Sequence, residues 1–189
     1  MFNRNQTIKQ TQNYIPSLNN LQSMSLDMPN VSVPKDQSRN EWVAYHVFEF
    51  LKYMKDIQAI IQDTCTCPTM KCGGFEFMWS DGKATQSLSA LEYFNKVESL
   101  IYKLSADESM FPIDNTKYQR DFIKKVSTIY RRMFRTFVHA YLQHQDYLKD
   151  QGLELVCLSK MKHFYYFCKE YDLCKKEDFS IIQGIIDKI

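Results

Sequence analysis

The stretch RRMFRTFVHAYLQH, residues 131–144, combines the apolar pattern of a core helix with three arginines and two histidines. Phe134, Phe137 and Tyr141 recur at helical spacing, so one face of this segment is expected to be buried. The same fourteen residues carry cations and imidazoles that are able to bind a metal. This segment therefore bears on both the fold and the function.

Length and composition predict one globular domain. The chain has 189 residues, of which 44% are hydrophobic and 14% aromatic, enough for a core of its own. Its five glycines and five prolines are too few for a turn-dense sandwich or barrel. The formal net charge of +2 lacks the strong basic excess of a nucleic-acid-binding protein, so we expect no nucleic-acid partner.

The N-terminal sequence and the cysteines bear on the compartment. MFNRNQTIKQTQNY is polar, and no run of eighteen uncharged apolar residues occurs in the chain. We therefore expect neither a secretory signal nor a transmembrane segment. The six cysteines are then expected in a reducing compartment, the cytoplasm or the nucleus, where clustered thiols favour metal binding over disulfides.

The chain divides into an N-terminal arm and a helical domain. Residues 1–37 are rich in Asn, Gln and Ser, and we expect a regulatory arm that is partly disordered or draped over the domain. In residues 38–189, helical patterns extend over residues 38–63, 89–104, 117–145, 155–171 and 176–188. Ser38 with Glu41, and Ser89 with Glu92, have the spacing of capping boxes.

Between the first two of these helices the pattern breaks. Pro68, Gly73 and Gly74 end the helix, residues 75–79 (FEFMW) are expected as a short strand, and Asp81-Gly82 is a turn signal. The sequence therefore predicts an all-α helical bundle with one small hairpin or loop excursion.

Two cysteines and two histidines form a candidate metal site. Cys65 and Cys67 follow the first helix, and His139 and His144 lie on the long one, a set that suits tetrahedral structural zinc. One residue between the cysteines is a tight spacing, and Cys72 is an alternative partner for Cys67. Five residues turn about 140° on a helix, so both imidazoles can reach one ion only if the helix ends nearby. The alternative is that these are packing residues without a metal. No HExxH motif supports a catalytic metal.

The arginines form a second candidate site. On a helical wheel Arg131, Arg132 and Arg135 spread over about 100° of one face. Guanidinium groups bind phosphate oxygens in pairs and stay charged, so three on one rigid helix could hold a phosphate group. The alternative is a solvated face that keeps the helix soluble.

In order along the chain, several motifs resemble the Mob/phocein family of kinase-binding adaptors, from about residue 40 to the C-terminus. They are NEWVAYHVFEF, CPTM after a cysteine, FEFMWSDG, MFP, RRMFRTFVHAYLQH, KHFYYF and KEYDL. The resemblance implies a helical fold around a four-helix-bundle core, with structural zinc on Cys65, Cys67, His139 and His144. The family's two cysteines are usually further apart, so Cys72 stays an alternative ligand.

The resemblance also implies a function without catalysis. Arg131, Arg132 and Arg135 match a pocket for a phosphothreonine of an upstream kinase or scaffold. Glu41 and Trp42 match a face that receives the basic regulatory segment of NDR/LATS-class kinases, joined by Glu49 and His163 on the same surface. Family precedents include Hippo-like growth control, mitotic exit and cytokinesis. Thr7 and Thr11 are candidate regulatory phosphosites by residue type only. The competing hypothesis is a zinc-dependent hydrolase, which would need a coordination position open to water.

Overall fold

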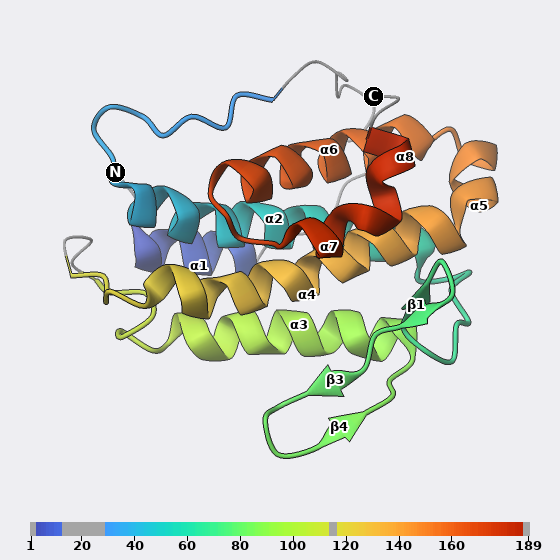
Figure 1. Ribbon diagram of the computed structural model, residues 1–189, viewed down its shortest axis with the longest axis horizontal. Coiled ribbons are helices and arrows are strands. Elements are labelled where there is room, and N and C mark those ends of the chain that lie inside the picture. The colour runs from blue at the N-terminus through green and yellow to red at the C-terminus, as the bar shows by residue number, and fades with distance from the viewer. Residues whose placement is uncertain (1–2, 13–28, 114–116, 187–189) are drawn as a thin grey trace.

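The computed structural model describes residues 3–12, 29–113 and 117–186 (Figure 1). Most of these residues are helical, as expected, with a few very short strands. In chain order the elements are α1 (Arg4–Gln12), α2 (Arg39–Ile61), β1 (Lys71–Cys72), β2 (Phe75–Glu76), β3 (Trp79–Ser80), β4 (Thr85–Gln86), α3 (Ala90–Ser105), α4 (Phe122–Gln143), α5 (Gln145–Asp150), α6 (Glu154–Glu170), α7 (Lys176–Phe179), the 3₁₀ helix η2 (Ser180–Ile182) and α8 (Gln183–Ile186).

The long helices α2, α3, α4 and α6 form the centre of the fold. α4 packs against each of the other three, and α2 also contacts α3 and α6. Figure 1 shows α3 and α6 on opposite sides of α4, with α2 behind it. Large aromatic side chains fill the space between these helices, among them Phe48, Tyr93, Tyr130, Phe137 and Phe164. Burial of this apolar surface is the main force that holds the helices together.

Both predicted N-caps are present. The Ser38 hydroxyl accepts a hydrogen bond from the Glu41 amide at 3.2 Å and starts α2. Ser89 and Glu92 form the full reciprocal capping box at the start of α3. These bonds satisfy amide groups that have no partner within the helix, so the polar side chains fix where each helix begins.

The long helix is shorter than its apolar pattern suggested. It was expected over residues 117–145, but α4 begins at Phe122 and ends at Gln143. His144 has φ −125° and ψ 22°, outside helical values, and α5 starts directly after it. This break removes the restriction of the helical wheel on His139 and His144.

The excursion between α2 and α3 contains two hairpins where one short strand was expected. β1 pairs with β2, Cys72 opposite Phe75, and β3 pairs with β4, Ser80 opposite Thr85. Gly73 and Gly74 have φ of +52° and +88°, as a two-residue type I′ turn requires. The predicted turn at Asp81-Gly82 closes the second hairpin.

At the N-terminus the structure contains a helix that the sequence did not predict. α1 packs against α2, and the buried Arg4 guanidinium donates hydrogen bonds to the Ser105 carbonyl at the end of α3. Thr7 and Thr11 on this helix are also buried, so a kinase could reach either hydroxyl only if α1 moved away. Residues 13–28 of the expected arm lie outside the described residues.

At the other end, the helix expected over residues 176–188 is divided into α7, η2 and α8, and residues 187–189 are outside the described part. Phe179 fixes α7 in place, because its ring packs against Phe134 of α4 at 5.2 Å and Tyr165 of α6 at 4.8 Å between centroids. None of the helices in the described ranges has both the length and the apolar character needed to cross a bilayer.

Candidate metal centre and partner-binding surfaces

The predicted zinc ligands lie together in the structure. One ligand atom from each of Cys65, Cys67, His139 and His144 lies within 4.8 Å of the others. Cys65 Sγ is 3.8 Å from His139 Nε2, and Cys67 Sγ is 3.9 Å from His144 Nε2. Zinc bond lengths of about 2.3 Å to sulfur and 2.1 Å to nitrogen place such atoms about 3.6 Å apart in a tetrahedron. The spacing of the four atoms therefore fits a zinc ion.

Three long helices meet at this group. The Cys65 amide donates to the Ile61 carbonyl at 2.8 Å, so the loop leaves the end of α2 directly. The Cys67 carbonyl accepts from the Ala90 amide at 3.1 Å, which joins the same loop to the start of α3. His139 comes from the last part of α4, and His144 from the break that follows it.

The His139 ring is held by a second hydrogen bond. Its Nδ1 lies 2.7 Å from the Lys71 carbonyl oxygen, which can only accept, so Nδ1 carries the proton. Nε2 is then unprotonated and directed at Cys65 Sγ. Such a bond from the second ring nitrogen is the usual support of a metal-binding histidine.

Burial sets the protonation of the ligands. It lowers the pKa of His139 and of His144, so both imidazoles are neutral at pH 7, the form that binds metal. It also raises the pKa of the Cys65 thiol. A bound cation would reverse this second effect by stabilising the thiolate. The chemistry of the donor set therefore fits zinc, and four protein ligands would leave no position for a reacting water.

Cys72, the alternative ligand, lies outside this group. Its thiol donates to the Val138 carbonyl at 3.6 Å. Burial raises the pKa of this thiol to about 12. Cys65, at the tight spacing from Cys67, is thus the cysteine that the fold brings to the histidines.

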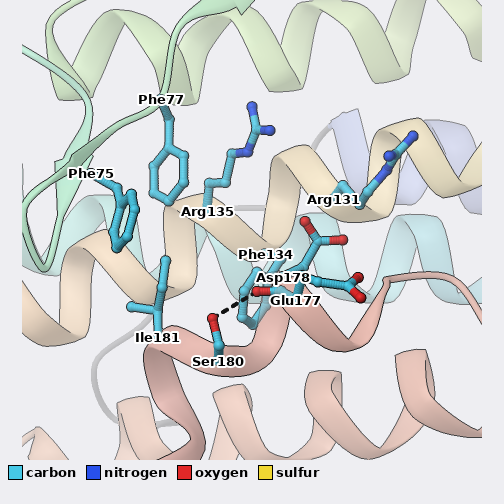
Figure 2. A pocket seen from close by; sticks show the side chains of 9 residues that line it. All are labelled: Phe75, Phe77, Arg131, Phe134, Arg135, Glu177, Asp178, Ser180 and Ile181. Carbon is cyan, nitrogen blue, oxygen red and sulfur yellow. Dashed lines mark hydrogen bonds between the residues drawn. The ribbon is translucent and has the colours of Figure 1, made fainter.

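The three arginines are divided between two cavities. Arg131 and Arg135 line a cavity of about 190 Å³ with Phe75, Phe77, Phe134, Glu177, Asp178, Ser180 and Ile181. Figure 2 shows both arginine side chains directed away from the two carboxylates of α7. The Arg135 guanidinium lies 5.0 Å from the centre of the Phe77 ring and donates to the Tyr93 hydroxyl at 3.1 Å.

Arg132 departs from the predicted cluster. Its guanidinium stacks 4.1 Å from the centre of the Trp79 ring and donates to the Ser80 carbonyl at 2.5 Å. It lines a different cavity, between α3 and α4. The helical wheel could not show this division, because the aromatic side chains of the hairpins decide where each guanidinium packs.

Sequence reasoning missed the other walls of the arginine cavity. Glu177, Asp178, Ser180 and Ile181 come from a segment expected only as the last helix. The aromatic wall comes from FEFMW, in which Phe75 remains 62% exposed. The single strand expected from the sequence did not indicate this exposure, which follows from the two hairpins of the structure.

The predicted kinase-binding residues are also divided. A group of partly exposed side chains on α2 and α6 includes three of them, and we call this group the docking ridge. It consists of Trp42, Tyr45, Glu49, Tyr53 and His163. His163 Nδ1 lies 3.4 Å from the Tyr53 hydroxyl. Glu49 forms an ion pair of 2.6 Å with Lys52 and is one of the causes that raise the pKa of Tyr45, after burial.

Glu41, expected on the same face, is instead only 5% exposed. After burial, its charge raises the pKa of Tyr118, whereas the charge of Arg4 lowers it. α1, which was not expected from the sequence, packs on α2, the helix that carries Glu41. Trp42 is held at the edge of the docking ridge, because its indole N–H donates to the Val31 carbonyl at 3.1 Å.

Taken together, the fold and the site define a mostly helical domain with a Cys₂His₂ group where three helices meet. Residues 19–182 match the Mob1/phocein family. MOB kinase activator 3A of Homo sapiens is 34% identical over 158 residues, 79% of this chain and 73% of that protein. MOB kinase activator-like 3 of Drosophila melanogaster is 32% identical over 167 residues, 84% of this chain and 76% of that protein. Maintenance of ploidy protein mob1 of Schizosaccharomyces pombe is 28% identical over 170 residues, 86% of this chain and 81% of that protein.

The chain belongs to the Mob1/phocein family. The resemblance inferred from the sequence motifs is confirmed. Its relatives are named as activators of kinases rather than as enzymes.

Proposed function

We propose that this protein is a non-catalytic adaptor and co-activator of an NDR/LATS-class protein kinase. The observation that carries the proposal is the family match over residues 19–182, with relatives named as kinase activators. The Cys₂His₂ group supports it, because four protein ligands suit a structural zinc and leave no site for hydrolysis. The hydrolase alternative has no such support.

Zinc would act here as a structural clamp on Cys65, Cys67, His139 and His144. It would hold the ends of α2 and α4 together, so that the docking ridge and the arginine cavity keep fixed positions. We further propose that the protein acts in the cytoplasm or nucleus, in Hippo-like, mitotic-exit or cytokinesis signalling. The name of the Schizosaccharomyces pombe relative, which refers to maintenance of ploidy, supports a role in division.

The docking ridge would receive the basic regulatory segment of the kinase. Glu49 supplies a carboxylate that is a quarter exposed, and its ion pair with Lys52 could be exchanged for one with the partner. Trp42, Tyr45 and Tyr53 supply the rigid aromatic surface that is typical of protein interfaces. Activation would follow if the bound segment is held in the conformation of the active kinase, a shift in population.

The arginine cavity would receive a phosphothreonine. Arg131 and Arg135 carry the charge, and Phe75 and Phe77 form an apolar wall for the neighbouring residues of the partner. Charge-assisted hydrogen bonds to phosphate are among the stronger polar interactions, at about 1.5–3 kcal/mol each. Arg132 would join only by leaving its stack on Trp79.

Replacing Glu49 tests the docking ridge. Glu49→Lys should weaken capture of a basic peptide from an NDR/LATS-class kinase by about tenfold, because one attractive charge becomes repulsive. Glu98→Lys is the matched control, since Glu98 is 25% exposed and also pairs with a lysine, Lys55, at 3.2 Å. Isothermal titration of both variants measures the effect. Equal affinity of the Glu49 and Glu98 variants would remove the ridge from the proposal.

A further inference from the structure

A second cavity lies on the other side of α7 from the arginine cavity. It has a volume of about 670 Å³ and is lined by lysines Lys169, Lys175 and Lys176, with Tyr165, Phe179 and Ser180 among the other walls. We call it the lysine cavity. Asp172 is the one acidic residue among its lining side chains, so three positive charges face one negative charge.

α7 separates charges of opposite sign. Lys175, just before the helix, and Lys176, its first residue, line the lysine cavity, whereas Glu177 and Asp178 line the arginine cavity. Ser180 lines both cavities, so the two are neighbours across this single turn of helix. An anionic group in the arginine cavity is therefore repelled by Glu177 and Asp178, whereas one in the lysine cavity is attracted by Lys175 and Lys176.

The lysine cavity combines apolar walls with exposed positive charges. Its two aromatic lining residues, Tyr165 and Phe179, are each only 6% exposed and form its apolar walls, so neither is available to insert into a bilayer. The three lysines are exposed at the surface of the cavity. Ammonium groups above an apolar recess suit an anionic side chain on an extended peptide.

We infer that the lysine cavity binds a second anionic residue of the same phosphothreonine partner, a phosphoserine, phosphothreonine, aspartate or glutamate. This rests on the proposed function, since it takes the first phosphate to lie beside Arg131 and Arg135. α7 is about 10 Å thick with its side chains, and an extended chain covers about 3.3 Å per residue. The second anion therefore lies about three residues from the phosphothreonine.

The test is selection from a phosphothreonine peptide library with randomised flanking positions. The wild-type protein should enrich acidic residues or phosphoserine about three positions from the phosphothreonine, on one side only. In fluorescence polarisation, a selected peptide should bind about fivefold more tightly than its counterpart with alanine at that position. Aspartate and phosphoserine versions distinguish a carboxylate from a second phosphate.

Lysine variants locate the effect. Lys175→Gln with Lys176→Gln should abolish the fivefold difference and leave the affinity for the alanine counterpart unchanged. Lys169→Gln, which lies on α6, should also reduce the fivefold difference in affinity. This variant keeps the test valid if the double change in Lys175 and Lys176 disturbs α7. Lys96→Gln with Lys103→Gln is the control, because it removes the same charge from exposed lysines of α3.

The outcomes separate this inference from the proposed function. Selection of phosphothreonine without any acidic preference would overturn the lysine cavity as a binding site and leave the arginine cavity intact. No selection of phosphothreonine at all would overturn both. An acidic preference that survives all three lysine changes, or lysine-dependent binding to phosphatidylserine vesicles with no acidic preference in the library, would also overturn the inference.

Discussion

Arg132 and Arg135 are three residues apart on α4, yet their guanidinium groups have different surroundings. Arg132 packs on Trp79 of β3, and burial lowers its pKa. Arg135 lies beside Phe77 in the arginine cavity. At the scale of single residues, the excursion between α2 and α3 thus holds Arg132 outside the arginine cavity and Arg135 at its wall.

This division predicts different defects for neighbouring substitutions. Arg131→Gln and Arg135→Gln should each weaken phosphothreonine-peptide binding by about tenfold or more. Arg131→Gln should change thermal stability little, whereas Arg135→Gln also loses the bond to the buried Tyr93 hydroxyl. Arg132→Gln should instead cost about 1–2 kcal/mol of folding free energy, since it loses the stack on Trp79 and the bond to Ser80. Fluorescence polarisation and thermal melts separate the two effects. Three equal losses of peptide binding would show that Arg132 also binds the phosphate.

The buried His46 predicts a pH-dependent stability. Burial lowers the pKa of His46 to about 3, while its Nδ1 donates to the Trp42 carbonyl at 3.0 Å. In the unfolded chain the pKa is about 6.5, so below that pH only the unfolded state takes up the proton. Stability from His46 is therefore complete above pH 6.5 and declines as the pH falls toward 3.

His46→Gln isolates this contribution. Between pH 7 and pH 5 the wild-type protein should lose about 2 kcal/mol more folding free energy than the variant, from 1.5 pH units at about 1.4 kcal/mol each. Urea denaturation at both pH values measures it. Any loss of folding free energy from protonation of the proposed zinc ligands occurs in both proteins, so it cancels in the difference between them. An identical pH dependence would mean that His46 is charged in the folded protein.

At the scale of elements, the sequence predicted those parts whose local signals agree with their packing. Ser89 and Glu92 mark the start of α3 because capping is a local interaction. α1 could not be predicted, because its nine residues have little apolar pattern and are held by contacts such as Arg4 to the Ser105 carbonyl, 101 residues away. The helix break at His144 has no proline or glycine to mark it, and the sequence indicated it only through the condition that both histidines reach one ion.

Zinc removal should loosen a defined junction between elements. The amides of Met70 and Ala90 donate to the carbonyls of Leu88 and Cys67, so these bonds connect the cysteine loop to the start of α3. After chelation, hydrogen exchange at Met70 and Ala90 should accelerate by at least tenfold, while Val97 in the middle of α3 should change little. NMR exchange rates provide the measurement. Uniform acceleration along α3 would mean that the metal supports the whole helix instead of this junction.

At the scale of the whole molecule, the sequence predicted the class of fold and the four Cys and His side chains that lie together in it, because apolar periodicity and ligand chemistry depend on residue types. It could not predict which surface each arginine or Glu41 would occupy. Those positions depend on α1, the hairpins and α7, whose placement is decided by tertiary contacts. The partner surfaces are thus less predictable from sequence than the core that carries them.

A structural zinc would support this entire arrangement. The domain has an extensive core without the metal, so chelation should weaken it without unfolding it completely, unlike a zinc finger. We expect a loss of about 3–5 kcal/mol, which corresponds to a fall in the thermal midpoint of roughly 10–15 °C for a chain of this size. His144→Ala should reproduce the loss and make the protein insensitive to chelator. Cys174→Ser, a half-buried cysteine outside the group, should do neither. Differential scanning calorimetry with zinc quantified by mass spectrometry tests this directly, and a melt that is unaffected by both chelator and His144→Ala would rule out a structural metal at the helix junction.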